Sequence, residues 1–173
     1  MSSTSDLALS PTFERARALS KVLRWFFIIN LGVTAVWVAS VLALLIWPQA
    51  ANYSPDGSLI SVAGLPMPER ITAVAATIIR TAPALVLLYH AIKIFGCFAR
   101  GEVFAATPIT HIRAAGFWTI IWAFAPALSE LVLQHQHVVK FNLPLLAFGI
   151  ATFIAAHVMG EAQRIADENA SIL

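Results

Sequence analysis

Long apolar segments, each with at most one Arg, Lys, Asp or Glu, recur along the chain, with shorter polar segments between them. Four of them approach the ~20 residues that a helix needs to cross a hydrocarbon layer about 30 Å thick. These segments are residues 25–47, 71–92, 114–133 and 143–159. We therefore predict an all-α fold, an integral membrane four-helix bundle that forms a single domain. The helices are expected to run up and down in chain order.

The polar segments predict what joins the helices. Residues 48–70 form a loop that begins at Pro48, contains the turn signal Pro55-Asp56-Gly57 and ends at Pro66 and Pro68. Within this loop, residues 59–62 are predicted to form a brief strand. The last segment, residues 160–173, places Ile165 and Ala166 among charges, which predicts an amphipathic helical tail.

Local signals mark where the helices begin and turn. Ser10-Pro11 and Thr107-Pro108 each combine an N-cap residue type with a proline at the first helical position. They predict a short helix before the first span and the start of the third helix, capped by Thr107. Gly96 and Gly101 are expected to let the backbone turn between the second and third spans.

The composition excludes several classes of protein. Hydrophobic residues make up 59% of the chain and charged residues 12%, against about 45–50% and about 25% in soluble domains. A soluble enzyme, a disordered chain and a nucleic-acid-binding module are therefore excluded. The single cysteine, Cys97, excludes an internal disulfide, a Cys-x-x-Cys redox pair and a multi-cysteine metal site.

The basic residues predict an orientation. Eight of them flank the spans on one side: Arg15, Arg17, Lys21, Arg24, Lys93, Arg100, Arg113 and Arg164. The other side has Arg70 and Lys140. The positive-inside rule then places both termini, the middle loop and the helical tail in the cytoplasm, and residues 48–70 outside. We expect the protein in the bacterial inner membrane. The positive-inside distribution, rather than binding to nucleic acid, explains its net positive charge.

Two opposite charges lie inside predicted spans, where an ionisable group is costly. Arg80 and Glu130 differ in backbone depth by roughly 9–10 Å at 1.5 Å per residue, a gap that their side chains can close. We interpret them as an intramembrane ion pair that joins two helices, or as an arginine that snorkels to water alone. The alternative is a substrate or proton relay in a small transporter.

Two prolines also fall inside spans. Pro83 and Pro126 each lie one turn on the cytoplasmic side of a charged residue. Each removes a backbone donor, so both are predicted as helix breaks that shape packing. Transporters use such breaks at binding sites, which keeps the transporter alternative open.

Histidines raise a second alternative. His90 and His157 lie at matching depths in the second and fourth spans, as the ligands of a haem between helices would. Dihaem membrane cytochromes usually carry two such pairs, so a haem- or quinone-linked electron carrier is the less favoured interpretation, and no cofactor is expected. His135-Gln136-His137 lacks neighbouring carboxylates or cysteines, so we expect a surface loop and no metal site.

Small residues recur every four positions in two spans. They are Ala35, Ala39 and Ala43 in the first and Ala147, Ala151 and Ala155 in the fourth. Such rows let helices approach closely. They are expected to pack the first helix against the fourth, or to mediate an oligomer.

Three motifs carry a resemblance to a known family. They are Gly101-Glu102-Val103-Phe104, then His111-Ile112-Arg113 through Gly116, and the acidic end Ala166-Asp167-Glu168-Asn169. The chain thereby resembles a bacterial family of small four-span inner-membrane proteins, known as domain of unknown function number 2975. The resemblance implies the same four-helix architecture. The family has no established catalytic residues, so the resemblance assigns none to this chain. It also implies a helix-turn-helix regulator in the cytoplasm as a partner.

We therefore expect a multi-pass inner-membrane protein that is not an enzyme. Its role would be that of an interaction partner, an accessory subunit or a membrane signalling partner. Its partners would be the lipid bilayer and either a membrane protein complex or the cytoplasmic regulator. It would not bind nucleic acid directly. The alternatives are a small transporter that uses Arg80 and Glu130, and an electron carrier that uses His90 and His157.

Overall fold

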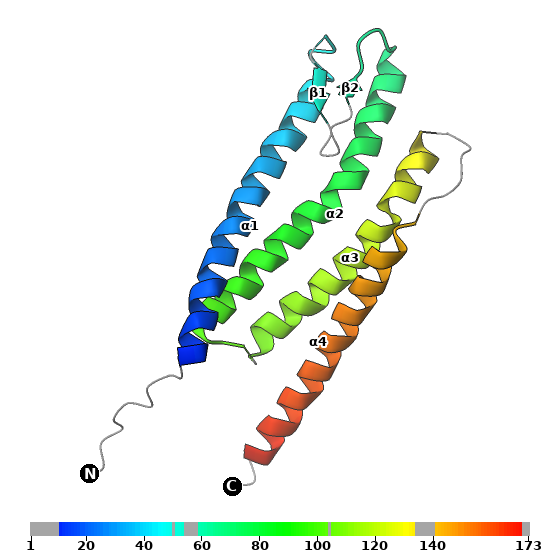
Figure 1. Ribbon diagram of the computed structural model, residues 1–173. Helices are drawn as coiled ribbons and strands as arrows, with labels where there is room; N and C mark the ends of the chain where they lie inside the picture. Colours follow the sequence, from blue (N-terminus) through cyan, green and yellow to red (C-terminus); the bar gives the residue numbers. More distant parts are fainter. Residues whose placement is uncertain (1–10, 50, 54–58, 104, 134–140, 171–173) are drawn as a thin grey trace.

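Four long helices and a small hairpin make up the described part of the chain. The computed structural model describes residues 11–49, 51–53, 59–103, 105–133 and 141–170. The elements are α1 (Pro11–Ala43), β1 (Ala51–Tyr53), β2 (Leu59–Ser61), α2 (Met67–Arg100), α3 (Ala106–Val132) and α4 (Leu143–Ala170). All four helices are long and apolar enough to cross a membrane (Figure 1). The predicted helical architecture with four candidate spans is confirmed.

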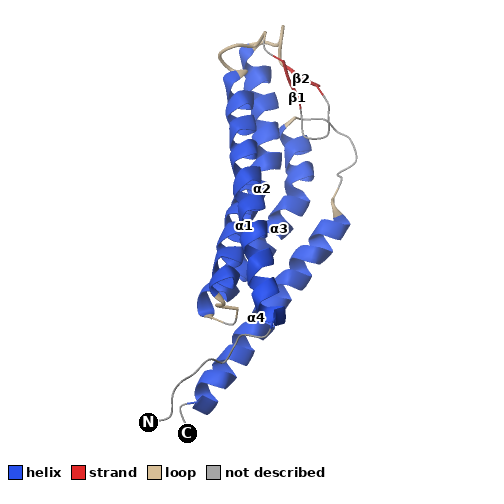
Figure 2. Ribbon diagram, turned by 60° about the vertical axis from the view of Figure 1, so that its left-hand side comes forward, coloured by secondary structure: helices blue, strands red, loops and turns tan. Residues whose placement is uncertain are grey.

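The helices form an open row. Among the described residues, extensive contacts join α1 to α2, α2 to α3 and α3 to α4. The helices alternate in direction, and α1 and α4 lie on opposite sides of the row in Figure 1. Figure 2 shows α4 running below α1 and α2 at its far end. A four-helix bundle with helices running up and down in chain order was predicted, and the order and the alternating directions agree with it. The first and last helices of the row therefore each pack extensively on one other described helix.

The last helix is shifted along its neighbour. The backbone N–H of Asn142 donates to the carbonyl of Ala123, 3.3 Å away, so α4 begins beside Ala123 rather than at the end of α3. As a result, the outer turns of α3 lie above α4, and α4 continues below the other helices (Figure 1). The predicted tail is helical and continuous with α4 as far as Ala170.

The helix starts differ from the predictions in two places. The first helix runs unbroken from Pro11 into the apolar segment instead of forming a separate short helix; Ser10 lies outside the described residues. The third begins earlier than expected, and its N-cap residue is Ala105 without a side-chain hydrogen bond. Thr107 is therefore inside the helix, and its predicted capping role is wrong. Pro108, which needs no backbone donor in the first turn, allows this earlier start.

The hairpin covers the C-terminal end of α1 and the N-terminal end of α2. Its strands pair antiparallel, with Asn52 opposite Ile60, so the predicted strand is confirmed at residues 59–61; the predicted turn at residues 55–57 lies outside the described residues. The next residue, Val62, is buried with Val41, Leu44 and Val74. This cluster fixes the loop onto the two helices.

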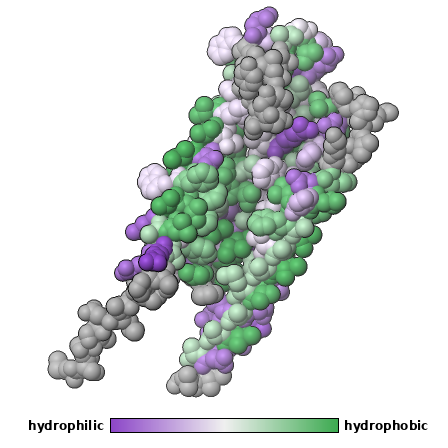
Figure 3. Space-filling view, in the orientation of Figure 1, coloured by the Kyte–Doolittle hydropathy of each residue, from purple (hydrophilic) through white to green (hydrophobic). Residues whose placement is uncertain are grey.

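Apolar side chains cover the outside of the row. Trp25 is 66% exposed, Leu131 76% and Ile154 56%. Figure 3 shows hydrophobic residues along the helices and hydrophilic ones mostly towards the ends. Such a surface is unfavourable in water and matches a hydrocarbon environment.

The two intrahelical prolines do not break their helices. Pro83 lies within Met67–Arg100 and Pro126 within Ala106–Val132. Each proline removes one backbone donor, and the helix continues on both sides of it. Pro83 is buried, which agrees with a packing role.

Glycines, rather than the alanine rows, bring two helices close. A Cβ atom on Gly116 of α3 would lie 2.7 Å from the backbone nitrogen of Phe153 in α4, and one on Gly149 would lie 3.0 Å from the carbonyl of Gly116. The predicted packing of α1 against α4 is wrong, because among the described residues α1 packs on α2 and α4 packs on α3. The exposed members of the alanine rows are Ala35, Ala39, Ala147, Ala151 and Ala155.

Candidate functional site

The first candidate site joins α2 to α3 near the C-terminal end of α3. Arg80 of α2 and Glu130 of α3 form an ion pair, with 3.0 Å between Nη2 and Oε1. Their side chains are 49% and 30% exposed. The structure therefore brings together the two charges that the sequence singled out. Arg80 does not extend alone to water.

A serine completes this site. Arg80 Nε donates to Ser129 Oγ at 2.7 Å, and the same hydroxyl donates to the carbonyl of Pro126 at 2.7 Å. Ser129 is fully buried, so the guanidinium is held by one buried and one partly exposed oxygen. Sequence reasoning missed Ser129, although its position next to Glu130 on the helix was a signal.

The structure places His90 beside His111 rather than beside His157. Nδ1 of His90 in α2 lies 3.1 Å from Nδ1 of His111 in α3, so one ring donates a hydrogen bond and the other accepts it. Two nitrogens that bind one metal ion from opposite sides would be about 4 Å apart, at ~2 Å each. His157 is exposed on α4, which packs on α3. The His90–His157 pair that the electron-carrier alternative would use is therefore not seen among the described contacts.

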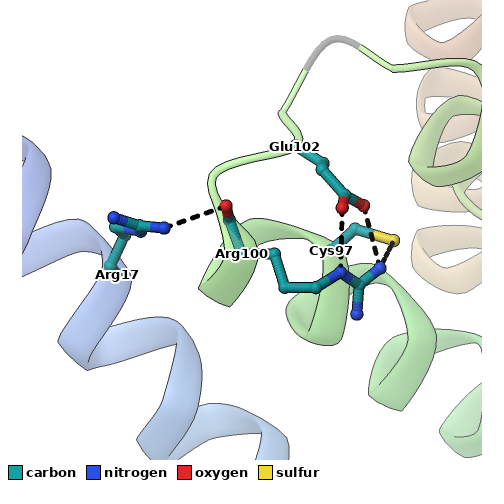
Figure 4. A network of polar contacts seen from close by, with 4 residues as sticks. All are labelled: Arg17, Cys97, Arg100 and Glu102. Atoms are coloured by element: carbon teal, nitrogen blue, oxygen red, sulfur yellow. Dashed lines mark hydrogen bonds and ion pairs between the residues drawn. The ribbon is translucent and has the colours of Figure 1, made fainter.

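At the end of the molecule opposite the hairpin, a polar network joins α1 to the C-terminal end of α2 (Figure 4). Arg17 Nη2 donates to the carbonyl oxygen of Arg100 at 2.9 Å. The next residue, Gly101, has a φ of 87°, a left-handed conformation that suits glycine. The predicted turn at Gly101 is confirmed. Gly96 lies within α2 and makes no turn.

Arg100 is held from two sides in this network. Its Nε and Nη2 donate to the two carboxylate oxygens of Glu102 at 2.9 and 2.8 Å, and Nη2 also donates to Cys97 Sγ at 3.2 Å. Hydrogen bonding to Arg100 lowers the pKa of the Glu102 carboxyl below its ordinary value. The bidentate pair therefore persists to lower pH than a free glutamate would allow.

A pocket of about 260 Å³ lies beside this network, between α1, α2 and α3. Its lining residues are Arg24, Ile92, Lys93, Gly96, Cys97, Arg100, Thr107 and His111. Side chains from three helices therefore meet here, and four of the lining side chains are basic. Phe104, the last residue of the motif that begins at Gly101, lies outside the described residues, as do His135 and His137.

Comparison with known proteins adds no relative. No protein-family model, curated protein or solved structure matches the chain. The resemblance to the family of unknown function stays a prediction, and the function must be argued from the chain itself.

Proposed function

We propose that the chain is a multi-pass protein of the bacterial inner membrane that acts by binding other proteins rather than by catalysis. One observation carries this proposal. Because the described helices form an open row, the faces of α1 and α4 that point away from the row have no other described helix packed against them. In a membrane, such faces contact either lipid or the helices of another protein.

The fourth helix is the face best suited to a partner. Ala147, Ala151 and Ala155 are exposed and share one side of α4, at the spacing that lets two helices approach closely in lipid. The opposite side of α4 carries Ala156, which is fully buried. The side towards α3 is thus filled, and the alanine side is free for a helix of another protein.

The Arg80 site supports an interaction protein more than a transporter. Its guanidinium bonds to Ser129 and Glu130, and the serine hydroxyl in turn bonds to the backbone. These bonds hold two neighbouring helices together. A transported substrate would have to displace them.

The tail supports a second contact, on the cytoplasmic side. Arg164 pairs with Glu161 at 2.9 Å and with Glu168 at 3.3 Å, so ion pairs on the helix surface stabilise this extension of α4. We propose this charged helix as the segment that a cytoplasmic helix-turn-helix regulator would bind.

Photo-crosslinking in living cells tests the proposal. A photoreactive residue at Ala151 should give a protein adduct of one defined mass, whereas the same residue at Ala156 of the same helix should crosslink only to α3. A position in the tail, Ala166, tests the cytoplasmic contact. Lipid adducts alone at Ala151, with no protein adduct at Ala166, would contradict an interaction role.

A further inference from the structure

The pocket at the inner end has an excess of positive charge that the described residues do not neutralise. Arg24 makes no hydrogen bond or ion pair with any residue in the described ranges, and Lys93 lies 5.4 Å above the ring of Tyr89. Arg100 has one acidic partner, Glu102. Three permanent cations therefore line a space of about 260 Å³, and no carboxylate of the described residues is among its lining side chains.

Two of these cations converge at one point. A Cβ atom on Gly96 would lie 3.7 Å from Arg24 Nε and 3.8 Å from Arg100 Nη1. The two guanidinium groups thus approach the same small residue from α1 and α2, although like charges repel. Glycine leaves open the space in which an anion would touch both groups.

We propose that this pocket binds a phosphate group. Arginine's planar guanidinium is suited to phosphate oxygens, and lysine supplies a further point charge. Thr107 and His111, from the beginning of α3, add a hydroxyl and an imidazole to the lining. This site is independent of the proposed interaction role, because it uses the inner ends of α1, α2 and α3 and not the outer face of α4.

The phosphate has two chemical sources, an anionic lipid headgroup and a soluble phosphate compound. Arg24 directly precedes the first long apolar segment, which is the depth of the headgroups when that segment fills the hydrocarbon layer. The binding experiment therefore includes both sources.

The full chain, purified in an uncharged detergent, is titrated with short-chain phosphatidylglycerol and, separately, with inorganic phosphate. Binding is followed by the rise in thermal midpoint and by native mass spectrometry. Phosphatidylcholine, whose phosphate is offset by its own choline cation, is the lipid control. We expect saturable binding of phosphatidylglycerol or of inorganic phosphate, and neither saturation nor a shift with phosphatidylcholine.

Three variants identify the site. Arg24→Gln should weaken binding about tenfold, the loss of one charge-assisted contact. Lys21→Gln is its matched control. It removes one positive charge from α1, about one turn before Arg24, and Lys21 is not among the residues that line the pocket. Gly96→Leu keeps every cation and fills the space, so it should abolish binding while the protein keeps its helical circular dichroism.

The outcomes separate the sources and decide the proposal. Saturation by phosphatidylglycerol at concentrations where inorganic phosphate has no effect identifies a lipid site. Saturation by inorganic phosphate, with competition between the two, identifies a soluble phosphate compound. Equal losses in Arg24→Gln and Lys21→Gln would mean a general basic surface and would overturn the pocket, as would no binding of either compound.

Discussion

Arg80 and Glu130 carry opposite charges on neighbouring helices, and each is costly to leave alone in an apolar environment. We predict that Arg80→Gln and Glu130→Gln each lower the free energy of unfolding in detergent. The double variant should lose less than the two single losses together, by about 1 kcal/mol, because each single change leaves the other charge unpaired. Thermal unfolding of the four proteins measures this coupling. Strictly additive losses would show that the pair makes no net contribution.

The histidine pair gives a second prediction at this scale. His111→Ala removes the partner of His90 and should destabilise the protein by about 1 kcal/mol, the net value of one hydrogen bond. His157→Ala changes an exposed side chain on α4 and should leave the thermal midpoint nearly unchanged. The reverse order of the two effects would contradict the pairing seen in the structure.

Single charges in apolar segments could be found in the sequence, but their full surroundings could not. Arg80 and Glu130 stand out because ionisable residues are rare inside spans. Ser129 does not stand out, since serine is tolerated in membrane helices and its role depends on which side of α3 meets α2. The partner of His90 was missed for a similar reason. His90 and His111 lie nearly equidistant from the turn at Gly101, and that turn folds them together.

The contact between α3 and α4 is closest at two glycines. A Gly→Ala substitution, which adds a single methyl group, therefore tests this contact. A Cβ atom on Gly116 would lie 2.7 Å from the backbone of Phe153, whereas one on Gly32 of α1 would meet nothing within 4 Å. Backbone atoms cannot move aside as a flexible side chain can. Gly116→Ala should therefore push the helices apart and cost about 1–3 kcal/mol.

Gly32→Ala is the matched control, since it makes the same change in a helix with open space around the residue. It should be neutral or stabilising by about 0.5–1 kcal/mol, because alanine favours the helix. Both effects are read from thermal unfolding in the same detergent. If Gly116→Ala were as harmless as Gly32→Ala, α3 and α4 would not pack through these glycines.

The positions of the helices could be predicted from the sequence, but which helices pack against each other could not. Long apolar runs indicate a span whatever surrounds it, and the proline signals at Pro66 and Pro68 marked the start of α2. The same runs are apolar on every side, so they do not reveal which face meets another helix. The open row, the shift of α4 and the close glycine contact therefore emerged with the structure, while the alanine rows suggested a contact that does not form.

For the whole molecule, the orientation of the helix row in the membrane is the claim on which the other proposals depend. The basic residues near the helix ends favour an inner side that holds both termini and the loop between α2 and α3. The phosphate pocket and the charged tail would then face the cytoplasm. The hairpin and the cluster around Val62 would face outward.

Paired reporter fusions test this orientation most directly, with alkaline phosphatase active outside and a green fluorescent protein fluorescent inside. We predict phosphatase activity for fusions after Ala51 and after His137, and fluorescence for fusions after Arg100 and after Leu173. Fluorescence after Ala51, or phosphatase activity after Arg100, would contradict the orientation.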